Sequence, residues 1–142
     1  MKLPDANVLI YSVNARAPQH GVAVEWLREA FAAPAGVGLA WISLVAFVRI
    51  STRSGIFSQP LTIGQALQIM NFWLDQPRVH ILHPTARHAS LMGNLLLSVG
   101  SAGNLTNDAH LAALAMEYGA TLASFDGDFD RFDDLNFERL RG

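Results

Sequence analysis

The sequence predicts one α/β domain built on a mainly parallel sheet of four or five strands. Short apolar runs alternate with longer segments of helical periodicity, and this alternation is typical of parallel strands joined by right-handed helical crossovers. Hydrophobic residues make up 51% of the 142 residues, which is enough to bury a substantial core. No linker, repeat or low-complexity tract divides the chain, so we expect a single domain over residues 1–142.

The strands are expected at short apolar runs, over residues 2–5, 37–40, 79–82, 121–125 and 136–140. A short apolar helix follows the first strand. Longer helices are expected over residues 19–33, 43–52, 62–75, 86–99 and 105–118. Pro34 ends the first of these, Ser43 is the expected N-cap of the second, and Gly119 ends the last.

The chain is poor in charge. Charged residues make up 15%, below the roughly 25% of an average globular chain, which indicates that a partner covers part of the surface. The net charge of −2 argues against a general nucleic-acid coat but allows a local nucleic-acid site. Because cysteine is absent, any metal must be held by oxygen or imidazole ligands. Proline and glycine interrupt the uncharged stretch 30–48, so we expect a cytoplasmic protein without a membrane segment.

Three acidic residues far apart in sequence are expected to meet at one edge of the sheet. Asp5 ends the first strand, Asp126 follows the fourth, and Asp108 begins the helix that leads into the fourth strand. The carboxyl ends of parallel strands form the usual ligand crevice of such a sheet. Each residue also has an ordinary alternative role, as a helix cap, a first-turn acid or part of a turn. Their convergence favours a functional site.

Carboxylates that gather without lysine partners need a counter-charge, and Lys2 is the only lysine. Mg²⁺ or Mn²⁺ suits oxygen ligands and substrate phosphate, and it supports phosphodiester hydrolysis. A calcium EF-hand is excluded because Arg131 and Phe137 stand where that loop needs glycine and glutamate. A phosphoaspartate phosphotransferase would use a lysine on a late strand, and none is present.

Three segments carry a family resemblance: "DANVLIYSVN" from Asp5, "VAFVRISTRSG" from Val45 and "TNDAHLAALAMEYGATLASFDGDFDRF" from Thr106. In this order and spacing they resemble PIN-domain proteins, and more narrowly the VapC toxins of bacterial toxin–antitoxin pairs. The resemblance spans nearly the whole chain and implies a PIN-like three-layer α/β/α fold. It also implies an endoribonuclease that depends on Mg²⁺ or Mn²⁺ and is silenced by a cognate antitoxin.

The resemblance also assigns roles by matching position. The metal is expected at Asp5, Asp108 and Asp126, while Asp128 completes the catalytic set. Asn7 and Ser124 match positions that support this cluster.

One departure concerns the middle helix, where the family usually has a glutamate and this chain has Ala46. A site with one fewer carboxylate should hold metal more weakly. This departure leaves a second hypothesis open, a catalytically weak module that binds RNA or a protein. Arg49 stands in an otherwise apolar segment, and we expect it to pair with the acidic cluster or to contact RNA phosphate. A snorkelling side chain at a helix edge is the alternative for Arg49.

The remaining acids of the segment 126–134 are expected to form a solvated surface, with Phe129 and Phe132 anchoring the loop in the core. Composition and resemblance together predict a homodimer whose surface carries an antitoxin-covered groove.

Overall fold

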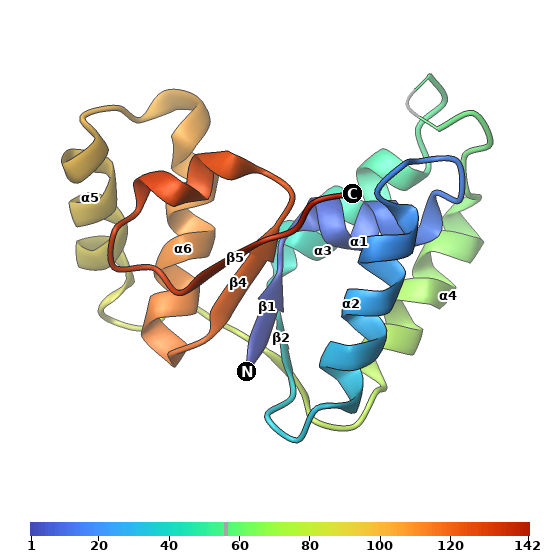
Figure 1. Ribbon diagram of the computed structural model, residues 1–142, viewed down its shortest axis with the longest axis horizontal. Helices are drawn as coiled ribbons and strands as arrows, with labels where there is room; N and C mark the ends of the chain where they lie inside the picture. The colour runs from blue at the N-terminus through green and yellow to red at the C-terminus, as the bar shows by residue number, and fades with distance from the viewer. Residues whose placement is uncertain (56) are drawn as a thin grey trace.

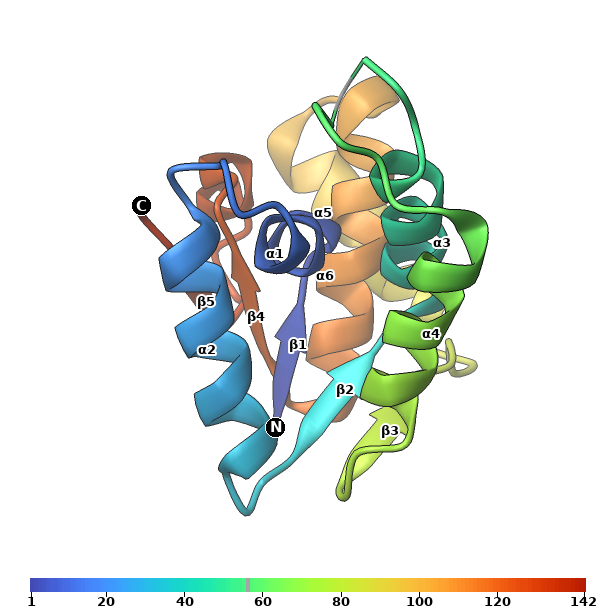
Figure 2. The same cartoon turned by 90° about the vertical axis from the view of Figure 1, so that its right-hand side faces the viewer.

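The computed structural model describes residues 1–55 and 57–142, and it contains a five-stranded sheet with helices on both faces (Figure 1). The strands are β1 (Lys2–Pro4), β2 (Val37–Leu39), β3 (Val79–Ile81), β4 (Thr121–Ser124) and β5 (Phe137–Arg139). They lie in the order β3-β2-β1-β4-β5, and every neighbouring pair is parallel (Figure 2). The predicted three-layer α/β/α class is confirmed.

The helices are α1 (Ala6–Val13), α2 (His20–Ala32), α3 (Trp41–Ser51), α4 (Ile63–Leu74), α5 (His88–Val99) and α6 (Thr106–Tyr118), with short 3₁₀ helices η1 (Gly103–Leu105) and η2 (Gly127–Arg131). In Figure 1, α5 and α6 lie on one side of the sheet, and α1, α2 and α4 lie on the other. The predicted strands and helices differ from these bounds by no more than two residues, which is the usual uncertainty at element ends. Within the described ranges, no helix is long and apolar enough to cross a membrane.

Each face of the sheet has its own hydrophobic core. On one face, buried side chains such as Leu9, Trp26 and Phe47 join α1, α2 and α3. On the other face, the alanine-rich helix α6 packs against α5 and β4. Phe129 and Phe132 belong to this second core, so the predicted anchoring of the acidic loop is confirmed. The last three acids of that loop are exposed, as predicted.

The prediction of Ser43 as an N-cap is wrong. Helix α3 begins two residues earlier, at Trp41, and Ala40 occupies the cap position without a side-chain hydrogen bond. Ser43 therefore lies inside the first turn, where it is buried and its hydroxyl has no hydrogen-bond partner among the described residues. Helix α4, in contrast, has a side-chain N-cap, since Thr62 Oγ1 accepts a hydrogen bond from the Gln65 amide at 3.1 Å.

The order of the strands places a switch point beside β1. The chain passes from β1 to β2 and β3 on one side, and then returns to form β4 and β5 on the other. Ligands of open parallel sheets bind at such a point, beyond the carboxyl ends of the strands. The Asp5 amide donates to the Ala123 carbonyl at 2.9 Å, so the residues that follow β1 and β4 lie side by side.

Lys2, the only lysine of the chain, forms an ion pair with Glu138. Lys2 Nζ donates to Glu138 Oε2 at 2.9 Å, and Trp26 Nε1 donates to Glu138 Oε1 at 2.7 Å. This contact ties β1, α2 and β5 together. Lys2 therefore does not neutralise the acidic residues at the carboxyl edge.

Candidate metal centre

Three carboxylates meet beyond the carboxyl ends of β1 and β4. Asp108 lies in the first turn of α6, while Asp126 and Asp128 lie at the start of η2. One carboxylate oxygen from each of these residues lies within 4.8 Å of the others, which is the spacing needed to share a single ion. Oxygen ligands of this kind suit a hard divalent cation.

Asp5 lies close enough to raise the pKa of Asp108 by its charge, but it is not a member of this group of three. Its Oδ1 accepts a hydrogen bond from the Ala6 amide at 2.7 Å and caps α1. Its Oδ2 accepts one from the Ser124 hydroxyl, also at 2.7 Å. Asp5 therefore does have the ordinary role of a helix cap, and it is also connected to the acidic cluster through Ser124.

Ser124 is the centre of a buried hydrogen-bond network. While its hydroxyl donates to Asp5, the oxygen accepts from Asn7 Nδ2 and from the Asp126 amide, each at 3.0 Å. Asn7 Oδ1 in turn accepts from the Phe125 amide at 3.2 Å. Both residues that were matched to supporting positions thus fix the end of β4, from which the acidic loop begins.

The acidic loop is also shaped by its own side chains. Asp126 Oδ1 accepts a hydrogen bond from the Asp128 amide at 2.9 Å, which closes a tight turn at the start of η2. The ordinary alternative for this segment is therefore correct as well. The turn brings both carboxylates to the same side as Asp108.

The electrostatics of the cluster favour a bound cation. Burial is the largest cause that raises the pKa of Asp108 to about 6, and the negative charges of Asp5, Asp126 and Asp128 add to it. Burial also raises the pKa of Asp5 above its usual range, against the hydrogen bonds from Ser124 and Ala6. An excess of negative charge that raises carboxyl pKa values is relieved by a divalent ion. The residues present therefore fit a metal.

A cavity of about 450 Å³ opens beside Asp5 and Asp108. Its opposite wall is formed by α3 and includes Ala46, so the position of the family glutamate does face the acidic residues. Arg49 lines the same cavity and is exposed. Among the described ion pairs none involves Arg49, so the expected pairing of Arg49 with the acidic cluster is not seen.

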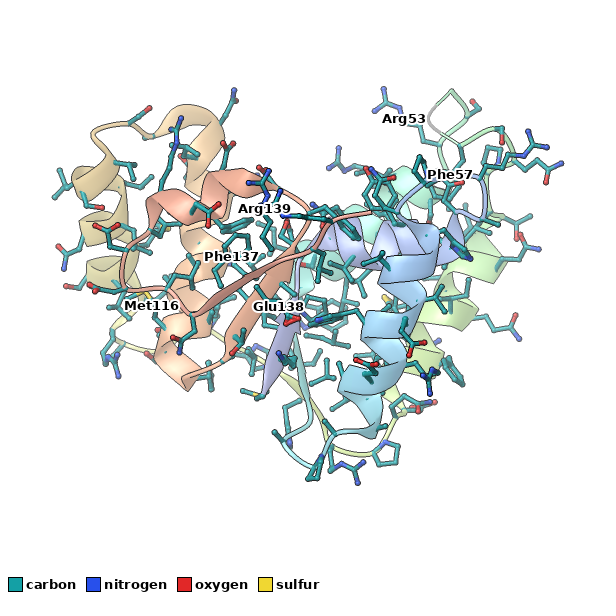
Figure 3. All side chains as sticks on the ribbon, viewed as in Figure 1. Arg53, Phe57, Met116, Phe137, Glu138 and Arg139 are labelled. Atoms are coloured by element: carbon teal, nitrogen blue, oxygen red, sulfur yellow. The ribbon has the colours of Figure 1, made fainter. Side chains whose placement is uncertain are left out.

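Sequence reasoning missed Arg139. Its guanidinium lies over the backbone of Gly127, the residue between Asp126 and Asp128 in the loop. The approach is so close that a Cβ added to Gly127 would lie 2.7 Å from Arg139 Cζ. The same guanidinium is 3.6 Å from Asp130 Oδ2. Figure 3 shows Arg139 on β5 beside η2. The only available signal was a single arginine in the last strand.

His110 follows Asp108 in α6, but the structure directs it toward α5. Its Nδ1 lies 2.8 Å from His88 Nε2, and His88 Nδ1 lies 2.9 Å from Glu117 Oε2. Burial is the largest cause that lowers the pKa of His110, and the neighbouring His88 adds to it. The two histidines and Glu117 join α5 to α6 and do not enlarge the acidic cluster.

A family model described as a PIN domain matches residues 2–135. The chain belongs to the PIN-domain family. It is 42% identical over 139 residues to Ribonuclease VapC37 of Mycobacterium tuberculosis, covering 98% of this chain and 96% of that protein. It is 37% identical over 137 residues to Ribonuclease VapC33 of the same species, covering 96% of each protein. The predictions of a PIN-domain protein and of a VapC-type toxin ribonuclease are confirmed.

Solved structures share the fold. Mycobacterium tuberculosis VapC20, described as a sarcin-ricin loop cleaving toxin, superposes with a TM-score of 0.71 at 18% identity, over 96% of this chain and 98% of that one. The VapBC-1 structure from nontypeable Haemophilus influenzae contains a chain with a TM-score of 0.69 at 21% identity, over 97% of this chain and 96% of that one. At these identities the likeness concerns the fold alone.

Proposed function

We propose that this VapC-type ribonuclease uses Asp5, Asp108, Asp126 and Asp128 as its catalytic set and requires Mg²⁺ or Mn²⁺. The observation that supports it best is the group of three carboxylate oxygens within 4.8 Å at the switch point of a PIN-type sheet. The sequence assigned the ion to Asp5, Asp108 and Asp126, whereas the grouped oxygens favour Asp128 in place of Asp5. Asp108, Asp126 and Asp128 would then hold the ion, and Asp5, oriented by its hydrogen bond with Ser124, would complete the catalytic set.

A bound ion of this kind supplies an activated water and neutralises the charge that develops on a phosphodiester. The protein residues prepare the site for it. Ser124 holds Asp5 in one orientation, because a carboxylate oxygen that accepts a short hydrogen bond does not rotate freely. Above pH 6 Asp108 is ionised and available to a cation. Arg49, which lines the same cavity, would contact an RNA phosphate.

The decisive experiment is cleavage of total bacterial RNA by the purified chain with Mg²⁺, with Mn²⁺ and with chelator, followed by sequencing of new 5′ ends. We expect a few discrete sites that require metal and vanish in Asp5→Asn. Asp133→Asn is the matched control, because Asp133 is an exposed acid of the same loop outside the cluster. A folded Asp5→Asn variant with full activity would contradict the assignment of Asp5.

The alternative function is a binding module without turnover, and Ala46 is the observation that favours it. It predicts RNA affinity with no cleavage in either metal. Absence of new 5′ ends from a folded, antitoxin-free preparation would support this alternative over the ribonuclease.

A groove between α2 and α4 is our candidate for the antitoxin site. It has a volume of about 680 Å³ and is largely apolar, with Val24, Phe31 and Phe72 among its lining residues. Among the similar structures are VapBC complexes, including VapBC2 from Rickettsia felis bound to a DNA fragment from their promoter. Such complexes support a cognate antitoxin as a partner, and we assign it to this groove because the groove is apolar and carries exposed side chains such as Phe72.

We also propose a homodimer in the cytoplasm, where RNA is available as substrate. Sedimentation velocity over a wide concentration range tests the dimer. A chain that stays monomeric at high concentration would contradict it.

A further inference from the structure

We infer that the cavity beside Asp5 and Asp108 binds one nucleobase of the RNA, and that it thereby selects the bond that is cut. This inference rests on the proposed ribonuclease function and extends it to the choice of cleavage site. The cavity volume of about 450 Å³ falls in the range of small-molecule sites. The small side chain of Ala46 on its wall leaves this space open where the family usually has glutamate.

One helix face supplies most of the cavity wall. Trp41, Val45 and Arg49 are spaced four residues apart on α3, so they lie along the same side of the helix. The opposite side comes from the start of α6, where Asn107 precedes the metal-site residue Asp108. A base held between these walls would therefore lie next to the phosphate that faces the ion.

The chemistry of the lining matches a base. The Trp41 side chain is 45% exposed, and an exposed indole offers a flat surface on which bases stack. Arg49 and Asn107 are both exposed and carry groups that can hydrogen-bond to base edges. The structure therefore combines a stacking surface with polar groups, which are the two components of single-stranded RNA recognition.

The test uses short oligonucleotides copied from one mapped cleavage site, with each of the four bases placed in turn at the nucleotides flanking the cut bond. We expect wild type to prefer one base at one of these nucleotides. Loss of a stacking contact worth about 1–3 kcal/mol should reduce that preference, measured as a ratio of kcat/KM values, roughly tenfold or more in Trp41→Ala. Trp41→Phe should restore it, and the Mn²⁺ affinity of Trp41→Ala should equal that of wild type.

Tyr118→Ala is the matched control, since Tyr118 is 40% exposed and lies at the other end of α6, about 15 Å along the axis from Asp108. It should keep the base preference of wild type. An unchanged preference in Trp41→Ala, or a wild type indifferent to both flanking bases, would overturn the inference. A third outcome would also overturn the inference: Trp41→Ala dissociates a dimer, and the base preference returns at protein concentrations that restore the dimer. Failure of wild type to cut any RNA would instead refute the proposed ribonuclease function.

Discussion

At the scale of single residues, Asp108 links metal binding to pH. Its pKa is raised to about 6, so below that pH its carboxyl is increasingly protonated and must lose the proton before it can bind a cation. We predict that Mn²⁺ affinity is constant above pH 7 and falls about tenfold for each pH unit below 6. Isothermal titration between pH 5 and pH 8 measures this. An affinity that does not change over that range would contradict the role of Asp108 as a ligand.

A substitution at Ala46 tests whether this position can contribute to metal binding. Because Ala46 lines the cavity with Asp5 and Asp108, we predict that Ala46→Glu adds a carboxylate to the site and tightens Mn²⁺ binding about tenfold, or about 1.4 kcal/mol. Ala46→Gln is the matched control, since it adds similar volume without the charge. Equal Mn²⁺ affinities of the two variants would show that position 46 does not reach the ion.

At the scale of elements, Arg139 joins the last strand to the acidic loop. Its guanidinium covers Gly127 and lies near Asp130, so we expect it to restrain η2. We predict that Arg139→Gln raises amide exchange over residues 127–132 about fivefold, because an exposed ion pair contributes up to about 1 kcal/mol. Hydrogen–deuterium exchange measures the change. Arg141→Gln is the control, and an equal increase in that variant would contradict a specific restraint by Arg139.

At the scale of the whole molecule, the apolar groove that we propose for the antitoxin shares no lining residue with the acidic cluster. Phe72 lines it and is 63% exposed, while the acidic cluster lies on other elements. We predict that Phe72→Glu keeps RNA cleavage but escapes neutralisation by the antitoxin in co-expression and pull-down experiments. Ile63→Glu is the matched control, since Ile63 is 69% exposed on the same helix but does not line the groove. Neutralisation of Phe72→Glu equal to wild type would exclude this groove.

The sequence predicts part of the site but not all of it. Strand ends follow from local apolar patterns, and the parallel order then brings Asp5 and Asp126 together, so this convergence was predictable. Local patterns carry less information about packing. The start of α3 was misplaced because Ser43 has the chemistry of a cap but faces the core. The place of Arg139 over Gly127 depends on a contact between two segments, which no spacing in the sequence reveals.

The pairing of β1 with β4 also determines when the site can form during synthesis of the chain. Asp5 is synthesised near the start of the chain, but the hydroxyl that donates a hydrogen bond to it belongs to Ser124. Two of the three clustered acids, Asp126 and Asp128, are synthesised after Ser124. A partly synthesised chain that ends before β4 therefore lacks the proposed catalytic set, because Ser124, Asp126 and Asp128 have not yet been made. The proposed ribonuclease activity would therefore arise only after β4 and the acidic loop have been synthesised and folded against β1.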